Sequence, residues 1–436
     1  MTRIAFITLG CKTNQFETQA MEMYAREAGC EVVPPEEKAD IYVVNTCAVT
    51  SNAGKKSRQE MRGARKRNPE AVIAACGCYS LLAAEELLRS GDADLSGGNR
   101  DHKAFLEACL AYRKDSPVLL PTDEKAPFER LPAGHPAGRT RSLLKIEDGC
   151  SNFCAYCVIP YLRGRVRSGD PRFLEAEVKR LVSDGAREIV ITGIEIASYG
   201  EDLPGKPTLA SLLELLLPAA GEARLRLGSL EPRVITEDFC RKLSGYPSLC
   251  PHFHLSLQSG SDTVLKRMGR KYDTALFRRS VGLLREYFPD AAITTDIITG
   301  FPGETEEEFR ETLDFCREIR FDRVHAFPYS MREGTRAARM PDQVPRAVKE
   351  ERVAVLSELS GAIASEKLGE SVGKTVRVLF ETEENGVSTG YTANYHAFFT
   401  RRTGLSGRLL PAVVREAKDG GLWGELLPGE EPAARA

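Results

Sequence analysis

Residues 149–157, with the sequence GCSNFCAYC, constrain this chain more than any other stretch. Cys150, Cys154 and Cys157 are spaced to hold one face of an inorganic cluster, because thiolates are soft ligands that suit iron–sulfur centres. Three ligands on a four-iron cluster leave one iron open for chemistry. Structural zinc is the alternative, but it requires a fourth Cys or His nearby, and the next histidine is His252. The spacing therefore favours a cluster.

Length and composition set the remaining bounds. The chain has 436 residues, which suggests two or three domains, and its 42% hydrophobic and 28% charged content is typical of a soluble globular protein. The formal net charge of -2 predicts that any nucleic-acid contact comes from local patches. Twelve cysteines without a signal peptide predict reduced thiols in the cytoplasm. No apolar run is long enough to span a bilayer, so we expect no membrane association.

Residues 1–100 repeat one local pattern three times. Short apolar runs at residues 3–9, 40–46 and 71–75 are each followed by a turn and a helical pattern. Strand, turn and helix in repetition predict a parallel α/β sheet.

A cysteine follows each of these runs, at Cys11, at Cys47 and at either Cys76 or Cys78. The carboxyl ends of parallel strands form one edge of a sheet, where ligands bind in open α/β folds. Three cysteines far apart in the sequence could therefore converge on one point, although a free cysteine is more often simply buried. We prefer Cys78 to Cys76, because Cys78 follows a glycine on the turn into the helix, as Cys11 does.

A proline-containing polar segment at residues 123–138 predicts a linker between residues 1–122 and a second unit, residues 139–370. The strands expected in this unit are residues 142–147, 188–192, 224–230, 252–258, 292–299 and 323–329, and the expected helices are residues 171–183, 208–217, 236–243, 274–287 and 305–319. Six such units predict a partial (βα)6 barrel, which a charged helix at residues 344–367 would close. Short strands with glycine turns predict a small β-barrel, of OB-like type, at residues 371–436.

Acidic and small residues end several of the expected barrel strands. Glu195 follows the second strand, Ser229 and Glu231 end the third, and residues 258–261 and 296–304 end the fourth and fifth. Each of these alone is more often a helix cap or a surface charge. Barrel active sites lie at the strand carboxyl ends, so their coincidence with the cysteine motif predicts binding of a ligand with an amine, ribose hydroxyls and an adenine edge.

Basic residues cluster in two runs beside these positions. The first run is Lys55, Lys56, Arg58, Arg62, Arg65, Lys66 and Arg67, and the second is Arg163, Arg165 and Arg167. Charge runs are often solvated faces, yet their position near two proposed metal centres suggests a phosphate-bearing macromolecular substrate. The last unit combines Arg401, Arg402 and Arg408 with Tyr391, Tyr395, Phe398 and Phe399, a mixture used on single-stranded nucleic acid. A solvated capping module is the alternative.

The motif CSNFCAYC resembles the CxxxCxxC motif of radical S-adenosylmethionine (SAM) enzymes, with Tyr156 in the aromatic position before the third cysteine. VIPYLRG at residues 158–164, TLGCKTNQFET, NTCAVTSNAGKKSRQ and GCY at residues 77–79 resemble the methylthiotransferases over nearly the whole chain. Within that family TLGCK and NTCAVT are most similar to the MtaB branch, the tRNA N6-threonylcarbamoyladenosine methylthiotransferases. The isopentenyladenosine enzymes tend to have GCQMN and NTCSVR, and the ribosomal-protein enzymes GCPKN and NTCGF.

This resemblance implies a fold, two clusters and a substrate. Residues 371–436 would be a TRAM domain. Cys150, Cys154 and Cys157 would hold a [4Fe-4S] cluster whose open iron chelates SAM, which on reduction yields a 5'-deoxyadenosyl radical. That radical would abstract hydrogen from C2 of the modified adenosine at tRNA position 37. The resemblance also implies that a second [4Fe-4S] cluster, held by Cys11, Cys47 and Cys78, presents the sulfur, and that Tyr156, Glu195, Ser229 and Glu231 contact SAM.

The resemblance further implies that the TRAM domain and the basic helix hold the tRNA anticodon stem-loop, and that a flavodoxin- or ferredoxin-type donor supplies electrons at low potential. Two alternatives stay open at this point. The same chemistry could act on N6-isopentenyladenosine or on a ribosomal-protein aspartate. A non-catalytic RNA-binding protein with structural zinc is the alternative of another class.

Overall fold

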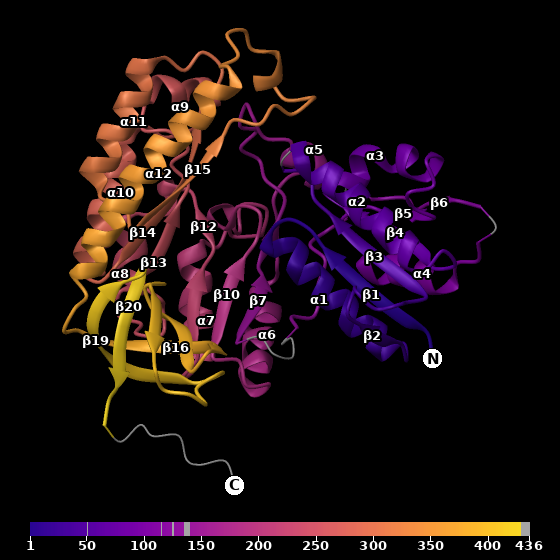
Figure 1. The fold of residues 1–436 in the computed structure, drawn as a ribbon, viewed down its shortest axis with the longest axis horizontal. Coiled ribbons are helices and arrows are strands. Elements are labelled where there is room, and N and C mark those ends of the chain that lie inside the picture. The colour runs from indigo at the N-terminus through magenta and orange to yellow at the C-terminus, as the bar shows by residue number, and fades with distance from the viewer. Residues whose placement is uncertain (50, 115, 124–125, 135–139, 429–436) are drawn as a thin grey trace.

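The computed structural model describes the chain except residues 50, 115, 124–125, 135–139 and 429–436 (Figure 1). Three units follow one another: an N-terminal parallel α/β sheet, a partial barrel and a closed C-terminal β-barrel. Within the described residues, no helix is both long and apolar enough to cross a membrane.

The N-terminal unit is a six-stranded parallel sheet in the order β2-β1-β3-β4-β5-β6. Its strands are β1 (Arg3–Thr8), β2 (Glu31–Val33), β3 (Ile41–Thr46), β4 (Val72–Gly77), β5 (Leu95–Ser96) and β6 (Val118–Leu119). Its helices are α1 (Lys12–Glu27), α2 (Ser51–Arg67), α3 (Cys78–Arg89) and α4 (His102–Ala111). The three predicted strands are confirmed, because their apolar runs are buried between helices on both faces.

The second unit is a partial barrel built from two parallel sheets. One sheet contains β7 (Arg141–Lys145), β10 (Glu188–Thr192) and β11 (Arg224–Leu227), and the other contains β12 (Ser229–Leu230), β13 (His252–Leu255), β14 (Ala292–Thr299) and β15 (Arg323–Pro328). The third predicted strand is broken at Gly228, whose N–H still donates to Ile191 O at 2.8 Å. After the break the chain leaves β10 and pairs with β13, so the third strand joins the two sheets.

Helices cover the outer face of this barrel (Figure 1). They are α6 (Pro171–Ser183), α7 (Leu209–Ala219), α8 (Glu237–Leu243), α9 (Asp262–Met268), α10 (Thr274–Tyr287), α11 (Glu306–Ile319) and α12 (Arg346–Gly369), with the short elements β8 (Glu147–Asp148), α5 (Ile159–Arg163) and β9 (Arg167–Ser168) after β7. Side-chain caps define several starts: Asp170 caps α6, and Thr305 with Glu308 forms a capping box on α11. The predicted helices are present, and α9 is an addition.

Helix α1 lies between the N-terminal sheet and barrel strand β7 (Figure 1). Phe16 and Ala20 of α1 are buried in the same apolar cluster as Leu143 and Leu144 of β7. The predicted linker, residues 123–138, falls partly outside the described residues, and in its described part Leu131 joins this cluster too. The first two units are therefore packed together rather than joined only by a tether.

The C-terminal unit is a closed five-stranded barrel. Its strands are β16 (Thr375–Glu384), β17 (Val387–Thr392), β18 (Ala397–Thr400), β19 (Leu409–Lys418) and β20 (Gly421–Leu426), in the order β16-β17-β18-β20-β19. It docks at the amino ends of the first barrel strands, where Arg224 donates to Tyr391 O at 2.9 Å and Arg226 to Ala393 O at 2.9 Å. This unit therefore lies at the end of the partial barrel opposite to its strand carboxyl ends.

Candidate cluster-binding active site

The N-terminal cysteines lie at the carboxyl ends of three neighbouring strands: Cys11 follows β1, Cys47 follows β3, and Cys78 follows β4 and starts α3. Gly10 and Gly77, which precede two of them, have φ of 99° and 89°, a backbone conformation that glycine adopts freely. A Cβ added to Gly10 would stand 2.8 Å from Cys47 Sγ. The sharp turns therefore bring the cysteines of adjacent strands together.

Cys76 and Cys78 point to different surroundings. Cys76 is buried in the apolar cluster beside Cys109 of α4. Cys78 shares its surroundings with Cys11, because Arg163 donates to Cys78 Sγ at 3.3 Å and to Asn14 Oδ1 at 2.9 Å, and Cys11 Sγ donates to the same Asn14 Oδ1 at 3.5 Å. This placement supports the preference for Cys78 as a ligand, because only Cys78 shares the edge with Cys11.

The loop carrying Cys150, Cys154 and Cys157 is held from both sides by backbone hydrogen bonds. Cys150 N donates to Gly164 O at 3.0 Å, Ala155 N donates to Met268 O at 2.8 Å, and Ala337 N donates to Ala155 O at 2.8 Å. The loop starts after β8, at the carboxyl edge of the barrel, as predicted. Burial raises the pKa of Cys150 to about 12 and that of Cys157 to about 11, so charge-neutral thiols are favoured until a cation or metal compensates the thiolates.

Helix α5 connects the CxxxCxxC loop to the edge of the N-terminal sheet that carries Cys78. It starts two residues after Cys157 and packs against α3, whose first residue is Cys78 (Figure 1). The charge of Cys78 contributes to the raised pKa of Cys157, after burial and the charge of Cys154. Arg100 Nη2 also donates to Arg163 O at 2.7 Å and fixes the end of α5 to the N-terminal unit. Cys78 of the N-terminal set therefore lies beside the helix that follows Cys157.

Arg163 is fully buried at this junction and binds both units. Its Nε donates to Cys78 Sγ at 3.3 Å, and its two terminal nitrogens donate to Glu17 at 2.8 and 3.1 Å and to Asn14 at 2.9 Å in the N-terminal unit. On the barrel side it donates to Asp148 at 3.1 Å. Arg163 is therefore not part of a basic rim, and the prediction that it forms one with Arg165 and Arg167 is wrong for this residue.

Further buried charges complete the network. Lys145 of β7 lies 3.2 Å from Glu17 and 3.3 Å from Asp148. Burial alone would raise the pKa of Glu17, but Arg163 and Lys145 outweigh it and hold that pKa well below its usual range. His102 Nδ1 of α4 donates to Glu129 at 2.7 Å, and despite burial this carboxylate and Glu17 raise the pKa of His102 to about 9. Paired charges of this kind are tolerated inside proteins because each has several partners.

The predicted SAM-contacting residues gather around the CxxxCxxC loop. Burial, followed by repulsion from Glu231, raises the pKa of Glu195 to about 7, and Glu231 is nearly fully buried. Tyr156 packs edge to face on Phe301 at 6.5 Å between ring centres. Ser229 is exposed at the break in the third strand. Carboxylates, a hydroxyl and an aromatic ring therefore share the rim with the three cysteines.

Arg270 belongs to this site and was not predicted. Its Nη1 donates to Cys154 Sγ at 3.1 Å and its Nε to the hydroxyl of Tyr272 at 2.8 Å, while Tyr272 donates to Leu257 O at 2.9 Å. Arg270 follows α9, which the sequence pattern did not reveal. Glu17, Lys145, Asp148 and His102 were also missed, although Glu17 lies within the motif TLGCKTNQFET.

The amino ends of β7, β10 and β11 carry a concentration of cations around one buried carboxylate. Glu188 Oε1 lies 2.9 Å from Arg141 and 2.7 Å from Arg226, and Glu188 also pairs with Arg224. Tyr395 of the C-terminal barrel lies over the guanidinium of Arg226 at 4.5 Å. These charges line the end of the barrel that the C-terminal unit covers.

The surface residues expected to bind RNA are only partly available. In the basic helix α2, Arg58 and Arg62 pair with Asp92, and Arg65 pairs with Asp94. The predicted stacking surface of the C-terminal unit is wrong for Phe398, which is in its core. Tyr391 is half-buried and Tyr395 is exposed, and one face of each ring packs on Arg141. Phe399 is half-buried and stacks on Trp423 at 5.3 Å. Several of the predicted cations are exposed, as contact with RNA phosphates would require, among them Lys55, Lys56, Lys66 and Arg165.

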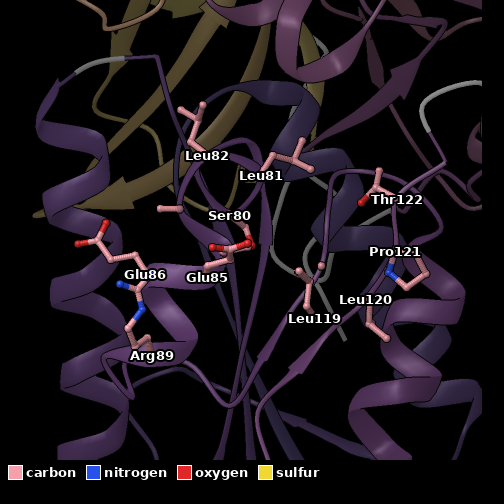
Figure 2. Close-up of a pocket in the computed structure, with 13 residues that line it drawn as sticks. Ser80, Leu81, Leu82, Glu85, Glu86, Arg89, Leu119, Leu120, Pro121 and Thr122 are labelled. Atoms are coloured by element: carbon pink, nitrogen blue, oxygen red, sulfur yellow. The ribbon is translucent and has the colours of Figure 1, made fainter.

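A cavity of about 710 Å³ lies elsewhere, along the outer side of α3 (Figure 2). Leu81 and Leu82 of α3 line it together with Leu119, Leu120 and other residues around β6. None of the predicted site residues is among its lining residues. Its walls also include the charged side chains of Glu85, Glu86 and Arg89, which lie on α3.

The donor chemistry at the two trios fits iron–sulfur clusters. All six cysteines are free thiols, and in the described part of the chain no three His, Cys, Asp or Glu side chains are arranged to hold a single metal ion. Buried arginines donate to a sulfur in each trio, from Arg163 to Cys78 and from Arg270 to Cys154. Positive hydrogen-bond donors beside the sulfurs suit an anionic thiolate-ligated cluster.

The fold and the cysteine sites define a radical SAM enzyme with an additional N-terminal α/β unit. Residues 144–316 match the radical SAM superfamily, and residues 3–98 match the uncharacterized protein family UPF0004. Among solved structures, the radical SAM methyltransferase TsrM from Kitasatospora setae shares the fold, with a TM-score of 0.55, 15% identity and coverage of 78% of this chain and 77% of that one.

Full-length relatives define the family more narrowly. A threonylcarbamoyladenosine tRNA methylthiotransferase MtaB from Bacillus subtilis is 41% identical over 426 residues, which cover 96% of this chain and 94% of the relative. A tRNA-2-methylthio-N(6)-dimethylallyladenosine synthase from a Thermoanaerobacter species is 35% identical, over 96% of this chain and 92% of that relative. The chain belongs to the MtaB-type methylthiotransferases of the radical SAM superfamily.

Proposed function

We propose that this chain transfers a methylthio group to C2 of N6-threonylcarbamoyladenosine at position 37 of tRNA. Relatives named for threonylcarbamoyladenosine tRNA are 35–41% identical, and three of them exceed the 34–35% of those named for dimethylallyladenosine. The observation that carries the proposal is that α5, which follows the loop of Cys150, Cys154 and Cys157, packs against α3, whose first residue is Cys78. This packing brings the two halves of the proposed site next to each other.

Six cysteines would hold the cofactors in this proposal. Cys150, Cys154 and Cys157 would ligate the SAM-binding [4Fe-4S] cluster, and Cys11, Cys47 and Cys78 would ligate the second. When bound, the clusters and SAM supply the radical and the sulfur for the reaction. The cytoplasm, where thiols stay reduced, suits these ligands.

Side chains of the chain itself would bind, orient and shield the reactants. Glu195 and Glu231 would accept hydrogen bonds from the amine and ribose of SAM, with Tyr156 and Ser229 beside them. Arg270 and Arg163 would hold the sulfur ligands in position through their hydrogen bonds to Cys154 and Cys78. The buried network behind Arg163 would exclude water from the space between the sites.

An anticodon stem-loop is the expected macromolecular substrate. Position 37 lies in the loop, so its base is unpaired or easily splayed, and presenting it costs less than flipping a base from a duplex. Lys55, Lys56 and Lys66 on α2 and Arg165 beside the loop are exposed cations that would contact its phosphates. Electrons would come from a flavodoxin- or ferredoxin-type donor.

Reconstituted protein, assayed anaerobically with SAM, a reductant and synthetic anticodon stem-loops, tests this function. We expect mass spectrometry of the digested nucleosides to show a methylthio product only from RNA that carries threonylcarbamoyladenosine. A product only from isopentenyladenosine RNA, or from a ribosomal protein, would assign the other substrates. Reconstituted protein that holds about two zinc ions and no iron would overturn radical chemistry altogether.

A further inference from the structure

Two aromatic side chains stand exposed beside the proposed SAM cluster site. Phe153 lies within the CxxxCxxC loop and is 37% exposed, and Tyr161 lies on α5 and is 62% exposed. A single exposed apolar side chain is normal on a protein surface, but these two rings are also in contact with each other. Neighbouring rings left in water indicate a surface that a partner covers.

The two rings form an open corner with a cation beside it. Their centres are 5.5 Å apart and their planes stand at 80° to each other, so the edge of one ring meets the face of the other. The guanidinium of Arg165 lies 5.9 Å from the centre of the Phe153 ring, and Arg165 is itself exposed. A flat group that enters this corner can lie on one ring while the other ring borders its edge.

The backbone holds both rings in place. Pro160 and Arg163, which flank Tyr161 on α5, are buried, and the hydrogen bond from Arg100 to Arg163 O ties this helix to the N-terminal unit. Phe153 has a φ of 49°, which is uncommon for a bulky side chain. Such a conformation costs energy and tends to occur at functional sites. The exposure of the rings is therefore built into the local backbone.

We propose that Phe153, Tyr161 and Arg165 bind single-stranded RNA, with a base next to the target nucleoside stacked on Tyr161. This inference rests on the proposed function, which brings an anticodon loop to this site. Aromatic rings beside a cation bind unpaired bases with little regard to their identity. Phe153 directly precedes the ligand Cys154, and Tyr161 follows Cys157 by four residues. A base held there would adjoin the one that is presented to the cluster.

An electron-donor protein is the other macromolecule that must approach this rim. Apolar area and charge in many arrangements would serve such a protein, whereas a ring face bordered by a second, perpendicular ring suits a planar base. The guanidinium of Arg165 can also contact a phosphate next to that base. The geometry therefore favours RNA, and the two partners differ in whether they require a ring at position 161.

Fluorescence anisotropy on the cluster-loaded protein tests the inference with a stem-loop that carries threonylcarbamoyladenosine. Tyr161→Leu keeps apolar area but has no ring, and we expect it to bind the stem-loop about 5- to 100-fold more weakly, as for the loss of one stacked base. Tyr161→Phe keeps the ring and should bind as wild-type protein does. Iron content should be unchanged in both variants.

Tyr112→Leu is the matched control. Tyr112 is half-buried in the connection from α4 to β6, at the sheet edge opposite to the cysteines, and its hydroxyl donates to Ser116 O at 3.0 Å. Its replacement should leave RNA binding unchanged. Equal losses in Tyr112→Leu and Tyr161→Leu would show a general effect of removing a ring and would overturn the inference.

Stem-loops that lack one base identify the contact. Removing the base on one side of position 37 should weaken binding to wild-type protein, and the same removal should cost Tyr161→Leu little more, because the stacking partner is already gone. If wild-type protein binds both base-lacking stem-loops as tightly as the intact one, the inference is overturned without reference to any variant. Independent, additive losses would also overturn it.

Two further outcomes separate this inference from its alternatives. If Tyr161→Leu binds RNA normally but its clusters are reduced more slowly by a reduced flavodoxin, the corner docks a donor protein and the inference is overturned. If wild-type protein forms no methylthio product from the threonylcarbamoyl RNA, the proposed function is overturned instead. If that product forms while Tyr161→Leu binds the RNA as wild-type protein does, only the stacking contact is wrong.

Discussion

Replacing Arg163 by methionine should uncouple the N-terminal unit from the barrel. The substitution keeps an unbranched side chain but leaves the carboxylates of Glu17 and Asp148 buried with fewer cations. Breaking a buried pair costs about 3–5 kcal/mol. Lys145 still lies 3.2 Å from Glu17 and 3.3 Å from Asp148, so we expect the lower end, about 3 kcal/mol.

The assay is thermal unfolding of the metal-free protein, followed by circular dichroism. A loss of about 3 kcal/mol corresponds to a fall in Tm of about 6–12 °C for a unit of about 150–250 residues. Arg163→Met should also reduce iron loading, because the hydrogen bond from Arg163 Nε to Cys78 Sγ at 3.3 Å is lost. Arg165→Met is the matched control, since Arg165 is exposed two residues away.

Adding Glu17→Gln to Arg163→Met sharpens the test. If the loss arises from an uncompensated buried carboxylate, neutralising Glu17 should recover part of the Tm. A Tm and iron content of Arg163→Met equal to those of Arg165→Met would refute the idea that this network joins the two units. If Glu17→Gln instead lowers the Tm of Arg163→Met as much as it lowers the Tm of wild-type protein, the loss does not come from an uncompensated carboxylate at Glu17, and the electrostatic explanation is refuted.

Three other predictions concern single groups. Cys78→Ala should lose about half the iron while Cys76→Ala keeps it, and the reverse iron contents would show that Cys76 is the ligand. Because the pKa of His102 is raised to about 9, its ionised form stabilises the fold by about 3 kcal/mol below pH ~6.5, and this stabilisation is lost as the pH rises toward 9. In wild-type protein the denaturant midpoint should therefore fall over this pH range, and in His102→Gln that fall should be absent. A His102→Gln protein with the wild-type pH profile would contradict the prediction. Glu195→Gln and Glu231→Gln should each weaken SAM binding about tenfold, measured by equilibrium dialysis, without changing iron content.

Most of the fold could be predicted from the sequence, because most strands and helices leave a pattern within their own stretch of residues. Short apolar runs identified the main strands, and the cysteine after each N-terminal run identified the carboxyl edge. The two-residue strands β5 and β6 are too short to leave a pattern. The break at Gly228 was missed because residues 224–230 read as one continuous strand, while pairing with two different sheets divides it.

The candidate site was predictable for the ligands and not for the residues around them. Arg163 belongs to a basic run that is typical of a solvated face, and nothing near it in the sequence indicates burial. Its partner Glu17 is 146 residues away. The contact of Tyr395 with Arg226 of a distant strand could not be predicted for the same reason. Contacts between segments that are far apart in the chain leave no periodic pattern in a single sequence.

The buried charges at Arg163 fix how the N-terminal unit lies against the partial barrel, which the proposed function requires of its two cysteine sites. An apolar interface tolerates small shifts, whereas a buried arginine loses its hydrogen bonds when its partners move. Arg163 binds Glu17 and Asn14 in one unit and Asp148 in the other, and it also touches Cys78. One relative placement of the two units satisfies all these contacts. Arg163 therefore holds Cys78 in one place relative to the loop of Cys150, Cys154 and Cys157, and in the proposed function it sets the distance between the two sites.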